Sequence, residues 1–306
     1  MATKDAEALE KMKLLEDRIK APSIWGRVPC GLRFEDLQDW RYDDAVRLLK
    51  KHYLTEDGEI TYRSMKIIED KEGTDEFVHN VRIWMKDKMS IAAVKEGTNK
   101  LVGVLIMRIQ EKSAFSRTFS RVKLTHNPLY STVMTFYNAI EKPVNVYQAL
   151  NVRRYFKIYI VALKSRYRHR GIAKEMLKAA IALSSSANVP AVAGIFTTAR
   201  SQTIASELGF TKLNEIYYIR YLIDGEIVFY DTGLGNYGAA MMAYRIPNVD
   251  EPQELTAHQS SRFNISMPEE EVEQEAGAAV EVPSPTPEAT VASEATGDKK
   301  PEKEKK

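Results

Sequence analysis

The feature that most restricts the fold of this chain is a strand, a helix and a second strand in direct succession between residues 155 and 197. The ranges 155–163 and 191–197 are short apolar runs rich in β-branched residues, as is typical of buried strands. The range between them contains an apolar stripe at helical spacing, formed by Ile172, Met176, Ala180 and Leu183. A βαβ unit of this kind indicates a mixed α/β domain, because the helix must cover a face of the sheet that the strands form.

Regular patterns on both sides of this unit predict further strands and helices. Strands are predicted at 31–34, 211–222 and 239–246, a β-hairpin at 90–95 and 101–109, and helices at 42–54, 129–139, 202–208 and after residue 73. Thr74 is expected to cap the last of these helices. Its buried face is predicted to consist of Phe77, Val81, Trp84 and Met85. We therefore expect a central twisted mixed sheet that is flanked by helices on both faces.

Charge is distributed unevenly along the chain. From residue 248 to the end there are 14 acidic and 6 basic residues, a net charge of −8, whereas the whole chain has a net charge of +2. Residues 1–247 therefore carry a net charge of +10. The acidic stretch is rich in Pro, Ala and Ser, which predicts a disordered tail. We expect a charged leader helix at 1–23, one folded domain at 24–247 and the tail at 248–306.

The composition argues against several classes of protein. The single cysteine, Cys30, excludes an intramolecular disulfide framework, and the five histidines lack the spacing of a metal site. The N-terminal residues are too charged for a signal peptide, and no apolar run reaches the roughly 20 residues that span a bilayer. We therefore expect a cytoplasmic protein with no metal and no membrane partner. The basic body suits an anionic partner, and charge alone does not distinguish nucleic acid, lipid headgroups and a phosphate-rich cofactor.

The short basic loop between the first strand and the helix of the βαβ unit is the segment that best indicates a binding site. Such a junction leaves several main-chain amides without an acceptor, and with the helix dipole they form an anion site suited to a pyrophosphate. Gly171 permits close approach of a ligand to the main chain, and Ala173 leaves the first helical turn open. The loop lacks the spacing of a Walker loop or a dinucleotide fingerprint. Positive charge around it comes from Arg166, Arg168, His169 and Arg170.

Two motifs in this region resemble those of the GNAT superfamily of N-acetyltransferases. Arg168, Gly171 and Ala173 fill the three defining positions of the acetyl-CoA signature Arg/Gln-x-x-Gly-x-Gly/Ala. Residues 201–210 are similar to the small residue and short helix ending in Gly-Phe that follow in the family. The wider range 31–247 looks like insect arylalkylamine N-acetyltransferase-like proteins. The resemblance implies a GNAT-type sheet and transfer of acetyl from acetyl-CoA to a small amine, of arylalkylamine or polyamine type, by direct attack in a ternary complex.

The resemblance also assigns residues to the binding of acetyl-CoA. The cofactor would lie between the strands at 155–163 and 191–197, with the main chain near Ala162 and Leu163 against its pantetheine arm. The full set of cofactor-binding residues that it implies is Ala162, Leu163, Arg168, His169, Arg170, Gly171, Ile172, Ala173 and Thr198. An acceptor pocket or the core would be lined by aromatic residues such as Trp84, Phe115, Phe119 and Tyr137.

Catalysis of this kind benefits from a proton acceptor, because an aliphatic amine with a pKa of about 10.4 is almost fully protonated at neutral pH. The insect enzymes use a glutamate near the first helix and carry a Glu-Pro pair after it, where this chain has residues 56–58. We expect Asp43 or Asp44 to supply the carboxylate and Ser201 to take part in proton transfer. The structural alternatives are helix N-terminal charge for the aspartates and an N-cap of the helix at 202–208 for Ser201.

Two further functions remain open at this level. One is a non-catalytic acetyl-CoA-binding or protein-interaction module, which would have kept the cofactor loop and lost the proton-handling groups. The other is nucleic-acid binding by the basic body, but the sequence contains no recognised binding motif that supports it. The expected partners are therefore acetyl-CoA and a small amine, and the sequence identifies neither the amine nor a partner of the tail.

Overall fold

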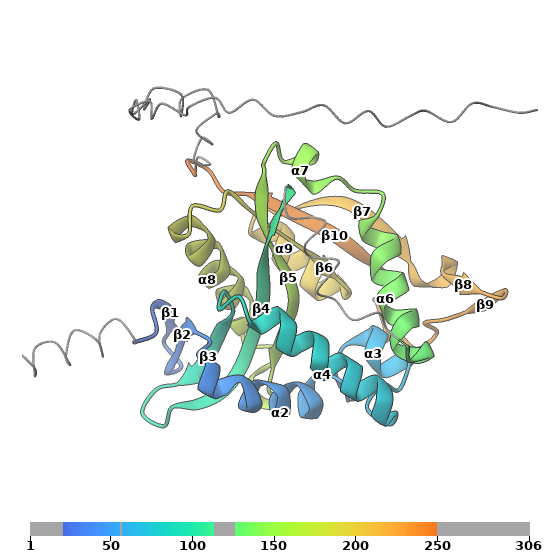
Figure 1. Ribbon diagram of the computed structural model, residues 1–306, viewed down its shortest axis with the longest axis horizontal. Helices are drawn as coiled ribbons and strands as arrows, with labels where there is room; N and C mark the ends of the chain where they lie inside the picture. Colours follow the sequence, from blue (N-terminus) through green and yellow to red (C-terminus); the bar gives the residue numbers. More distant parts are fainter. Residues whose placement is uncertain (1–20, 56, 113–125, 250–306) are drawn as a thin grey trace, which may run out of the picture. The chain divides into compact units, whose positions relative to one another are not determined.

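The computed structural model describes residues 21–55, 57–112 and 126–249 (Figure 1). Residues 1–20 of the predicted leader at 1–23 lie outside these ranges, and so does the predicted tail from residue 250 onward. Phe115 and Phe119 also lie outside the described residues.

An eight-stranded sheet forms the centre of the described part of the chain. From one edge to the other its strands are β1 (Ile24–Val28), β2 (Leu32–Asp36), β3 (Ile91–Lys95), β4 (Lys100–Glu111), β5 (Arg154–Leu163), β6 (Ala191–Phe196), β10 (Gly238–Arg245) and β7 (Thr211–Tyr217). The β5–β6 pair is parallel, and the other neighbouring pairs are antiparallel. This arrangement confirms the predicted mixed sheet and the β3–β4 hairpin. β1 is not among the predicted strands, because it lacks a clear alternation of apolar and polar residues and stays half-exposed.

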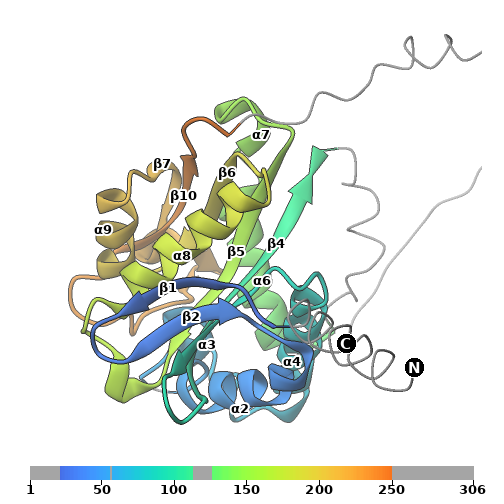
Figure 2. The same cartoon turned by 90° about the vertical axis from the view of Figure 1, so that its left-hand side faces the viewer.

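Helices cover both faces of the sheet, as predicted (Figure 2). One face is covered by α8 (Ile172–Ser186) and α9 (Ala199–Glu207), and the other by α2 (Tyr42–His52), α4 (Lys71–Met85) and α6 (Pro128–Glu141), with α3 (Ile60–Ser64) against α6. The shorter elements are α7 (Val146–Ala149) and the 3-10 turns η1 (Asp39–Arg41), η3 (Ser165–Tyr167) and η4 (Tyr218–Arg220). The sheet therefore separates one hydrophobic cluster on the α8 and α9 face from two on the opposite face, one of them under α2 and α4 and the other under the end of α6.

The apolar stripes predicted from helical spacing contribute to two of these clusters. The stripe of α8 is buried together with Phe156 and Leu105 of the sheet. The predicted face of α4 is buried on the opposite side, against Ala92 and Val104. Burying apolar area at about 25 cal/mol per Å² is the main favourable contribution to such packing, so the stripes fix which face of each helix meets the sheet.

β5 and β6 separate after a short paired stretch, which confirms the predicted split of the sheet. They pair only through Phe156–Val192, Lys157–Ala193 and Ile158–Gly194, whereas β5 continues to Leu163 and β6 to Phe196. The ladder between β4 and β5 skips Tyr159, which makes this residue a β-bulge at the point where the split begins. A bulge increases the local twist and bend of a strand, so β5 turns away from β6 here.

The start of α4 differs from the prediction. The helix begins at Lys71, and its N-cap is Asp70, whose carboxylate accepts a hydrogen bond of 2.7 Å from the amide of Gly73. Thr74 is instead buried within the first turns, where its hydroxyl donates to the carbonyl of Ile67 at 2.7 Å. Both residue types are good caps, and the tertiary contact of Thr74 with the preceding turn decides between them.

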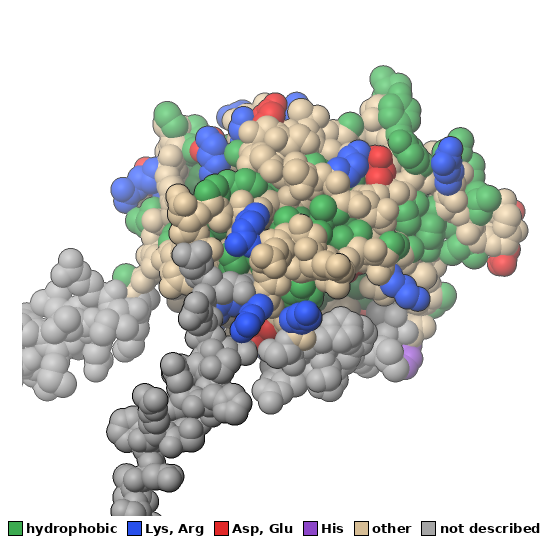
Figure 3. Space-filling model, turned by 90° about the horizontal axis from the view of Figure 1, so that it is seen from above, with side chains coloured by type: hydrophobic (Ala, Val, Ile, Leu, Met, Phe, Trp, Pro, Cys, Tyr) green, Lys and Arg blue, Asp and Glu red, His purple; other side chains and the backbone are tan. Residues whose placement is uncertain are grey.

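The strand predicted at 211–222 ends earlier, at Tyr217. The chain turns inward at Tyr218, whose buried hydroxyl donates to the carbonyl of Thr197 at 2.7 Å. The segment 218–237 then forms η4 and a small hairpin of β8 (Leu222–Ile223) and β9 (Glu226–Ile227). Its exposed large hydrophobic residues are Ile219, Leu222, Ile223, Ile227, Tyr230, Leu234 and Tyr237. Figure 3 shows hydrophobic side chains on its right-hand side, where β8 and β9 lie in Figure 1.

No helix in the described ranges is both long and apolar enough to cross a lipid bilayer. No group of three or more His, Cys, Asp and Glu side chains in the same ranges is placed to hold a metal ion.

Candidate functional site

The loop between β5 and α8 has the geometry of an anion site. His169 and Gly171 both adopt the left-handed backbone conformation, with φ of 60° and 76°, so the chain curls around a small space. Among the described residues, no hydrogen bond uses the main-chain amides of residues 169–174, and no side chain caps the first turn of α8. A Cβ built on Gly171 meets no atom within 4 Å. The loop therefore offers unpaired donors and a helix N-terminus to an anionic group.

The side chains of this loop divide into solvent-facing and anchored ones. His169 and Arg170 are exposed, so their charge or polarity surrounds the mouth of the loop. Ile172 is buried in the core and holds the first turn of α8 against the sheet. Ala173, two residues after Gly171, lines a cavity at the split of the sheet. The predicted loop residues thus lie together, but some face solvent, one is part of the core and one lines the cavity.

Arg168 is engaged by three main-chain carbonyls. Its guanidinium donates to the carbonyl of Leu163 at 3.2 Å and also to the carbonyls of His52 and Asp57. These carbonyls belong to the end of β5, the end of α2 and the turn after α2. Arg168 therefore ties the loop to the opposite side of the sheet, which is a positioning role rather than direct contact with an anion.

We expect Arg168→Ala to destabilise the protein by about 3 kcal/mol, because each hydrogen bond from a charged donor contributes about 1.5–3 kcal/mol and the three are not additive. Arg168→Lys should recover little of the stability that Arg168→Ala loses, since one ammonium cannot reach three separate carbonyls as a planar guanidinium does. Urea unfolding of the three proteins measures the free energies. A loss below about 0.5 kcal/mol, the range of ordinary surface substitutions, would contradict the anchoring role.

A cavity of about 220 Å³ lies at the split between β5 and β6. From β5 it is lined by Tyr159 and Val161, from β6 by Ile195 and Phe196. Ala173, Thr198 and Ser201 lie at the α8 and α9 side. Ala162 and Leu163 continue β5 beyond the split and are buried, but they do not line this cavity. The split therefore opens a passage through the sheet beside the start of α8.

Glu59 and Glu141 are the carboxylates that line this cavity among the described residues, and Glu59 is not among the site residues predicted from the sequence. It lies directly before α3, and its Oε1 atom is buried with no hydrogen-bond partner among the described residues. The tight turn before it depends on Gly58, since a Cβ at that position would lie 2.0 Å from the carbonyl oxygen of Tyr53. The Glu59 amide in turn donates to the same carbonyl at 2.8 Å, which fixes the main chain at this residue.

Burial raises the pKa of the Glu59 carboxyl, and the Thr197 hydroxyl and the Arg63 guanidinium oppose this shift by favouring the charged form. The rise is the net result, so desolvation outweighs the two polar neighbours. A carboxylate with a raised pKa is a stronger base than one in water, and Glu59 lines the cavity where β5 and β6 part. Such a group is suited to accept a proton from a bound ligand.

We expect Glu59→Gln to raise the melting temperature at pH 8 by roughly 2–4 °C, which corresponds to about 1 kcal/mol in a domain of this size. A raised pKa means that the folded protein binds this proton more tightly than the unfolded chain does. The group therefore favours folding at low pH, and this contribution is lost as pH rises through the folded pKa. The gain from the substitution should disappear at pH 4. Scanning calorimetry at both pH values measures the difference in melting temperature between the variant and the unaltered protein. A lower melting temperature of Glu59→Gln at pH 8 would contradict the raised pKa of Glu59.

Asp43 and Asp44, the predicted carboxylates, lie on the exposed side of α2. Asp43 pairs with Arg82 of α4 at 2.6 Å, and its side chain is 67% exposed. Asp44 pairs with Arg47 one helical turn onward. Neither residue lines the cavity at the split. The sequence held one signal for Glu59, because it directly follows residues 56–58, the region where the resemblance places a Glu-Pro pair.

Ser201 and Thr198 lie together at the start of α9, and both line the cavity. The helix begins at Ala199, so Thr198 is its N-cap and Ser201 is its third residue, which differs from the predicted cap at Ser201. The Thr198 hydroxyl accepts a hydrogen bond of 3.1 Å from the amide of Ser201, and the Ser201 hydroxyl accepts one of 3.2 Å from the amide of Thr198. This reciprocal box aims both hydroxyls at the end of β6.

Aromatic rings form the wall of the cavity on the α2, α4 and α6 side. The lining rings are Tyr53, Tyr62, Trp84, Tyr137 and Tyr159. Trp84 and Tyr159 stack with centroids 4.4 Å apart, and the Tyr137 hydroxyl shares a hydrogen bond of 2.7 Å with Thr61. Trp84 and Tyr137 were candidates for such a pocket from the sequence.

A half-buried ion pair also lines the cavity. Lys157 of β5 lies 2.5 Å from Glu141 of α6, and both side chains line the cavity. Burial alone would lower the pKa of Lys157, but Glu141 and the neighbouring Tyr159 more than offset this, so the pKa is raised. The pair is thus charged and compensated, leaving Glu59 as the carboxylate in the cavity with a free oxygen among the described residues.

Comparison with known proteins gives matches at the level of structure alone. No protein-family model matches the chain. No curated protein matches it in sequence.

Several solved structures resemble the described fold. Arylalkylamine N-acetyltransferase 7 of the yellow fever mosquito Aedes aegypti is 24% identical, with a TM-score of 0.65 over 75% of this chain and 96% of that one. Arylalkylamine N-acetyltransferase 2 of Aedes aegypti is 22% identical, with a TM-score of 0.64 over 70% and 99%. A Drosophila melanogaster polyamine N-acetyltransferase that forms N-acetylagmatine is 12% identical, with a TM-score of 0.56 over 70% and 100%. The chain therefore has the fold of the GNAT N-acetyltransferases.

Proposed function

We propose that this protein is an acetyl-CoA-dependent N-acetyltransferase that acts on a small amine. One observation carries the proposal: the cavity at the split of the sheet has the open amide loop of α8 beside one side and the buried carboxylate of Glu59 on the other. An anion-binding loop and a base that meet across a passage through the sheet are what transfer from a phosphate-bearing donor to an amine requires. The fold shared with N-acetyltransferases supports the same reaction class.

The residues present fit acetyl-CoA as the donor. The amides of residues 169–174 would hold its pyrophosphate, and the open space at Gly171 lets the phosphates approach the main chain. Exposed His169 and Arg170 add charge or polarity around this site. Beyond Ile158, β5 has no strand partner on the β6 side among the described residues, so its main chain can pair with the amides of the pantetheine arm. When bound, acetyl-CoA supplies the acetyl group as a thioester.

Proton handling falls to Glu59 and Ser201 in this proposal. Glu59 accepts a proton from the ammonium form of the amine, since only the neutral amine attacks a carbonyl carbon. Ser201 and Thr198 lie at the α9 side of the cavity. There the Ser201 hydroxyl would give up its hydrogen bond to the Thr198 carbonyl, donate its proton to the departing sulfur and regain a proton from the attacking nitrogen, while its oxygen still accepts from the Thr198 amide. Asp43 and Asp44 take part in surface ion pairs, so we assign the base to Glu59 and not to them.

The acceptor would lie against the aromatic wall. Rings such as Tyr53, Tyr62 and Tyr137 offer apolar surface and π-faces that attract a cation, and Glu59 provides the negative charge. A small amine with an aromatic or extended alkyl body suits this combination, in line with an arylalkylamine or a polyamine. We place the reaction in the cytoplasm and in a catalytic domain at residues 24–247.

Calorimetric titration of the full chain with acetyl-CoA, followed by turnover assays on a panel of arylalkylamines and polyamines, tests the proposal. Micromolar binding and release of free CoA that depends on the amine are the expected results. Binding without turnover on any amine would favour a non-catalytic module. A well-folded protein that does not bind acetyl-CoA would overturn the proposal.

A further inference from the structure

A second cavity, of about 750 Å³, lies outside the proposed catalytic site. It runs between α2 with η1 on one side and the β3–β4 turn with the start of the β5–α8 loop on the other. It shares no lining residue with the cavity at the split. We call it the basic groove, since its lining includes Arg41, Arg47, Lys51, Lys100, Lys164 and Arg166.

Positive charge in the basic groove exceeds the negative charge that the described residues supply. Asp44 is the single carboxylate among its lining residues, and it pairs with Arg47. Lys51, Lys100, Lys164 and Arg166 have no carboxylate within ion-pair distance in the described ranges. Four cations from three separate elements therefore face one hollow without compensation, which favours an anionic ligand.

The electrostatics of the groove agree with this reading. Burial first, and then the neighbouring cations Arg166, Lys100 and Lys51, lower the pKa of Lys164, although Asp44 acts in the opposite direction. Burial lowers the pKa of His52 as well, and the surrounding arginines and lysines add to this shift. Like-charge repulsion within the free protein would be relieved by a bound anion.

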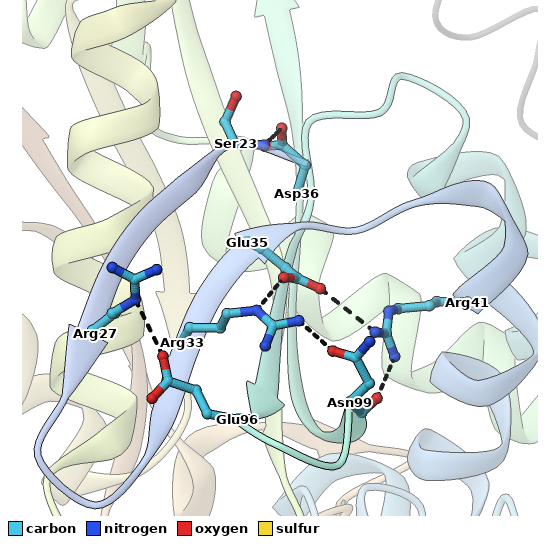
Figure 4. A network of polar contacts seen from close by, with 8 residues as sticks. All are labelled: Ser23, Arg27, Arg33, Glu35, Asp36, Arg41, Glu96 and Asn99. Atoms are coloured by element: carbon cyan, nitrogen blue, oxygen red, sulfur yellow. Dashed lines mark hydrogen bonds and ion pairs between the residues drawn. The ribbon is translucent and has the colours of Figure 1, made fainter. Parts of the chain in front are cut away.

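One end of the groove has a network of polar contacts around Arg41 (Figure 4) and, beside it, the exposed ring of Trp40. Arg41 is 2% exposed, donates to the carbonyl of Asn99 at 2.9 Å and lies 3.5 Å from Glu35, which also accepts from Arg33 at 2.6 Å. This network joins η1 to the β3–β4 turn, so the wall is preformed. Beside it, Trp40 is 67% exposed, with the Arg41 guanidinium 4.0 Å from the centroid of its ring. The opposite face of the indole is available for stacking.

We propose that the basic groove binds a nucleoside polyphosphate, with the base against Trp40 and the phosphates among the four uncompensated cations Lys51, Lys100, Lys164 and Arg166. Guanidinium and ammonium groups together bind phosphates well, because the arginine can donate to two oxygens at once. An exposed indole provides the stacking surface that a base needs and that a simple phosphate or an acidic peptide does not need, since stacking contributes about 1–3 kcal/mol per base. The volume of the groove lies in the usual range of about 300–1,000 Å³ for small-molecule sites.

Titration of the full chain with ATP, followed by calorimetry and by tryptophan fluorescence, tests this proposal. We expect saturable binding that weakens with added salt and quenches the fluorescence of Trp40, so that Trp40→Phe removes the optical signal. The double variant Lys51→Glu/Lys100→Glu should lose affinity at least tenfold. The matched control Lys71→Glu/Lys86→Glu makes the same charge change at exposed residues outside the groove and should bind ATP as the unaltered protein does.

Four results would overturn the proposal. The first is the absence of saturable ATP binding, and the second is an equal loss of affinity in the control variant. Competition of ATP with acetyl-CoA would mean that the anion occupies the cofactor loop or that the groove holds the nucleotide end of the cofactor, and not a separate ligand. Equal affinity for inorganic tripolyphosphate and ATP would show that stacking of the base on Trp40 does not contribute to binding. Binding that acetyl-CoA leaves unchanged, with ATP preferred over tripolyphosphate, is the supporting result.

Discussion

Gly171→Glu is expected to weaken the binding of acetyl-CoA at least ~100-fold, or about 2.7 kcal/mol. The backbone at this position has φ of 76°, a conformation that costs a non-glycine residue about 1–2 kcal/mol. A side chain here would also fill the space before the free amides of residues 169–174, and its negative charge would repel a pyrophosphate. Calorimetric titration with acetyl-CoA measures the loss directly.

Gly97→Glu is a matched control for this substitution. Gly97 lies in the β3–β4 turn, has the same φ of 76° and, like Gly171, has no atom within 4 Å of a built Cβ. Both variants therefore suffer the same backbone strain and the same charge change, and they differ only in their distance from the loop. Undiminished affinity in Gly171→Glu, or an equal loss in Gly97→Glu, would show that the loop does not hold the cofactor.

Glu59→Gln is expected to lower kcat by about 10²–10⁴-fold, the usual contribution of a general base. The amide cannot accept a proton, while it keeps the size of the side chain. Because the base acts in its deprotonated form, the rate of the unaltered protein should fall as pH drops through the raised pKa of Glu59. The variant should lack this step in its pH profile. Initial rates with saturating amine, measured between pH 5 and 9, give both quantities.

Asp43→Asn separates this role from the earlier expectation for the aspartates. It breaks an exposed ion pair with Arg82, which is typically worth no more than about 1 kcal/mol, and should leave kcat within about twofold. A large loss of kcat in Asp43→Asn together with a small loss in Glu59→Gln would mean that the general base lies in the N-terminal turn of α2. Acetyl-CoA affinity should be unchanged in both variants, which distinguishes loss of the base from loss of the cofactor site.

These two predictions differ in how much of their basis lies in the sequence. Gly171 stands at the junction of a strand and a helix, and the spacing of the stripe from Ile172 to Leu183 locates that junction without any tertiary information. Local geometry follows from such spacing, because the first turn of any helix leaves its amides free. The anion loop could therefore be derived from neighbouring residues alone.

Glu59 could not be derived in this way. It stands in a turn without periodic spacing, and its role depends on Thr197 and Arg63 nearby and on the opening of the sheet between β5 and β6. The same holds for Arg168, which donates to carbonyls of His52 and Asp57 more than a hundred residues earlier in the chain. A motif placed Arg168 in the loop, but only the packed structure shows that its charge serves to anchor it.

The sequence by itself determined the order of strands and helices around residues 155–197, the buried stripes of α4 and α8, and the loop before α8. These features depend on residues a few positions apart, whose period matches one type of secondary structure. The tertiary structure alone decided which carboxylate enters the cavity, which residue caps α4 and α9, and where unpaired cations gather into the basic groove. Those outcomes depend on contacts between segments far apart in the chain. The burial of a side chain and the distance between two charges at such contacts are set only when the chain has folded.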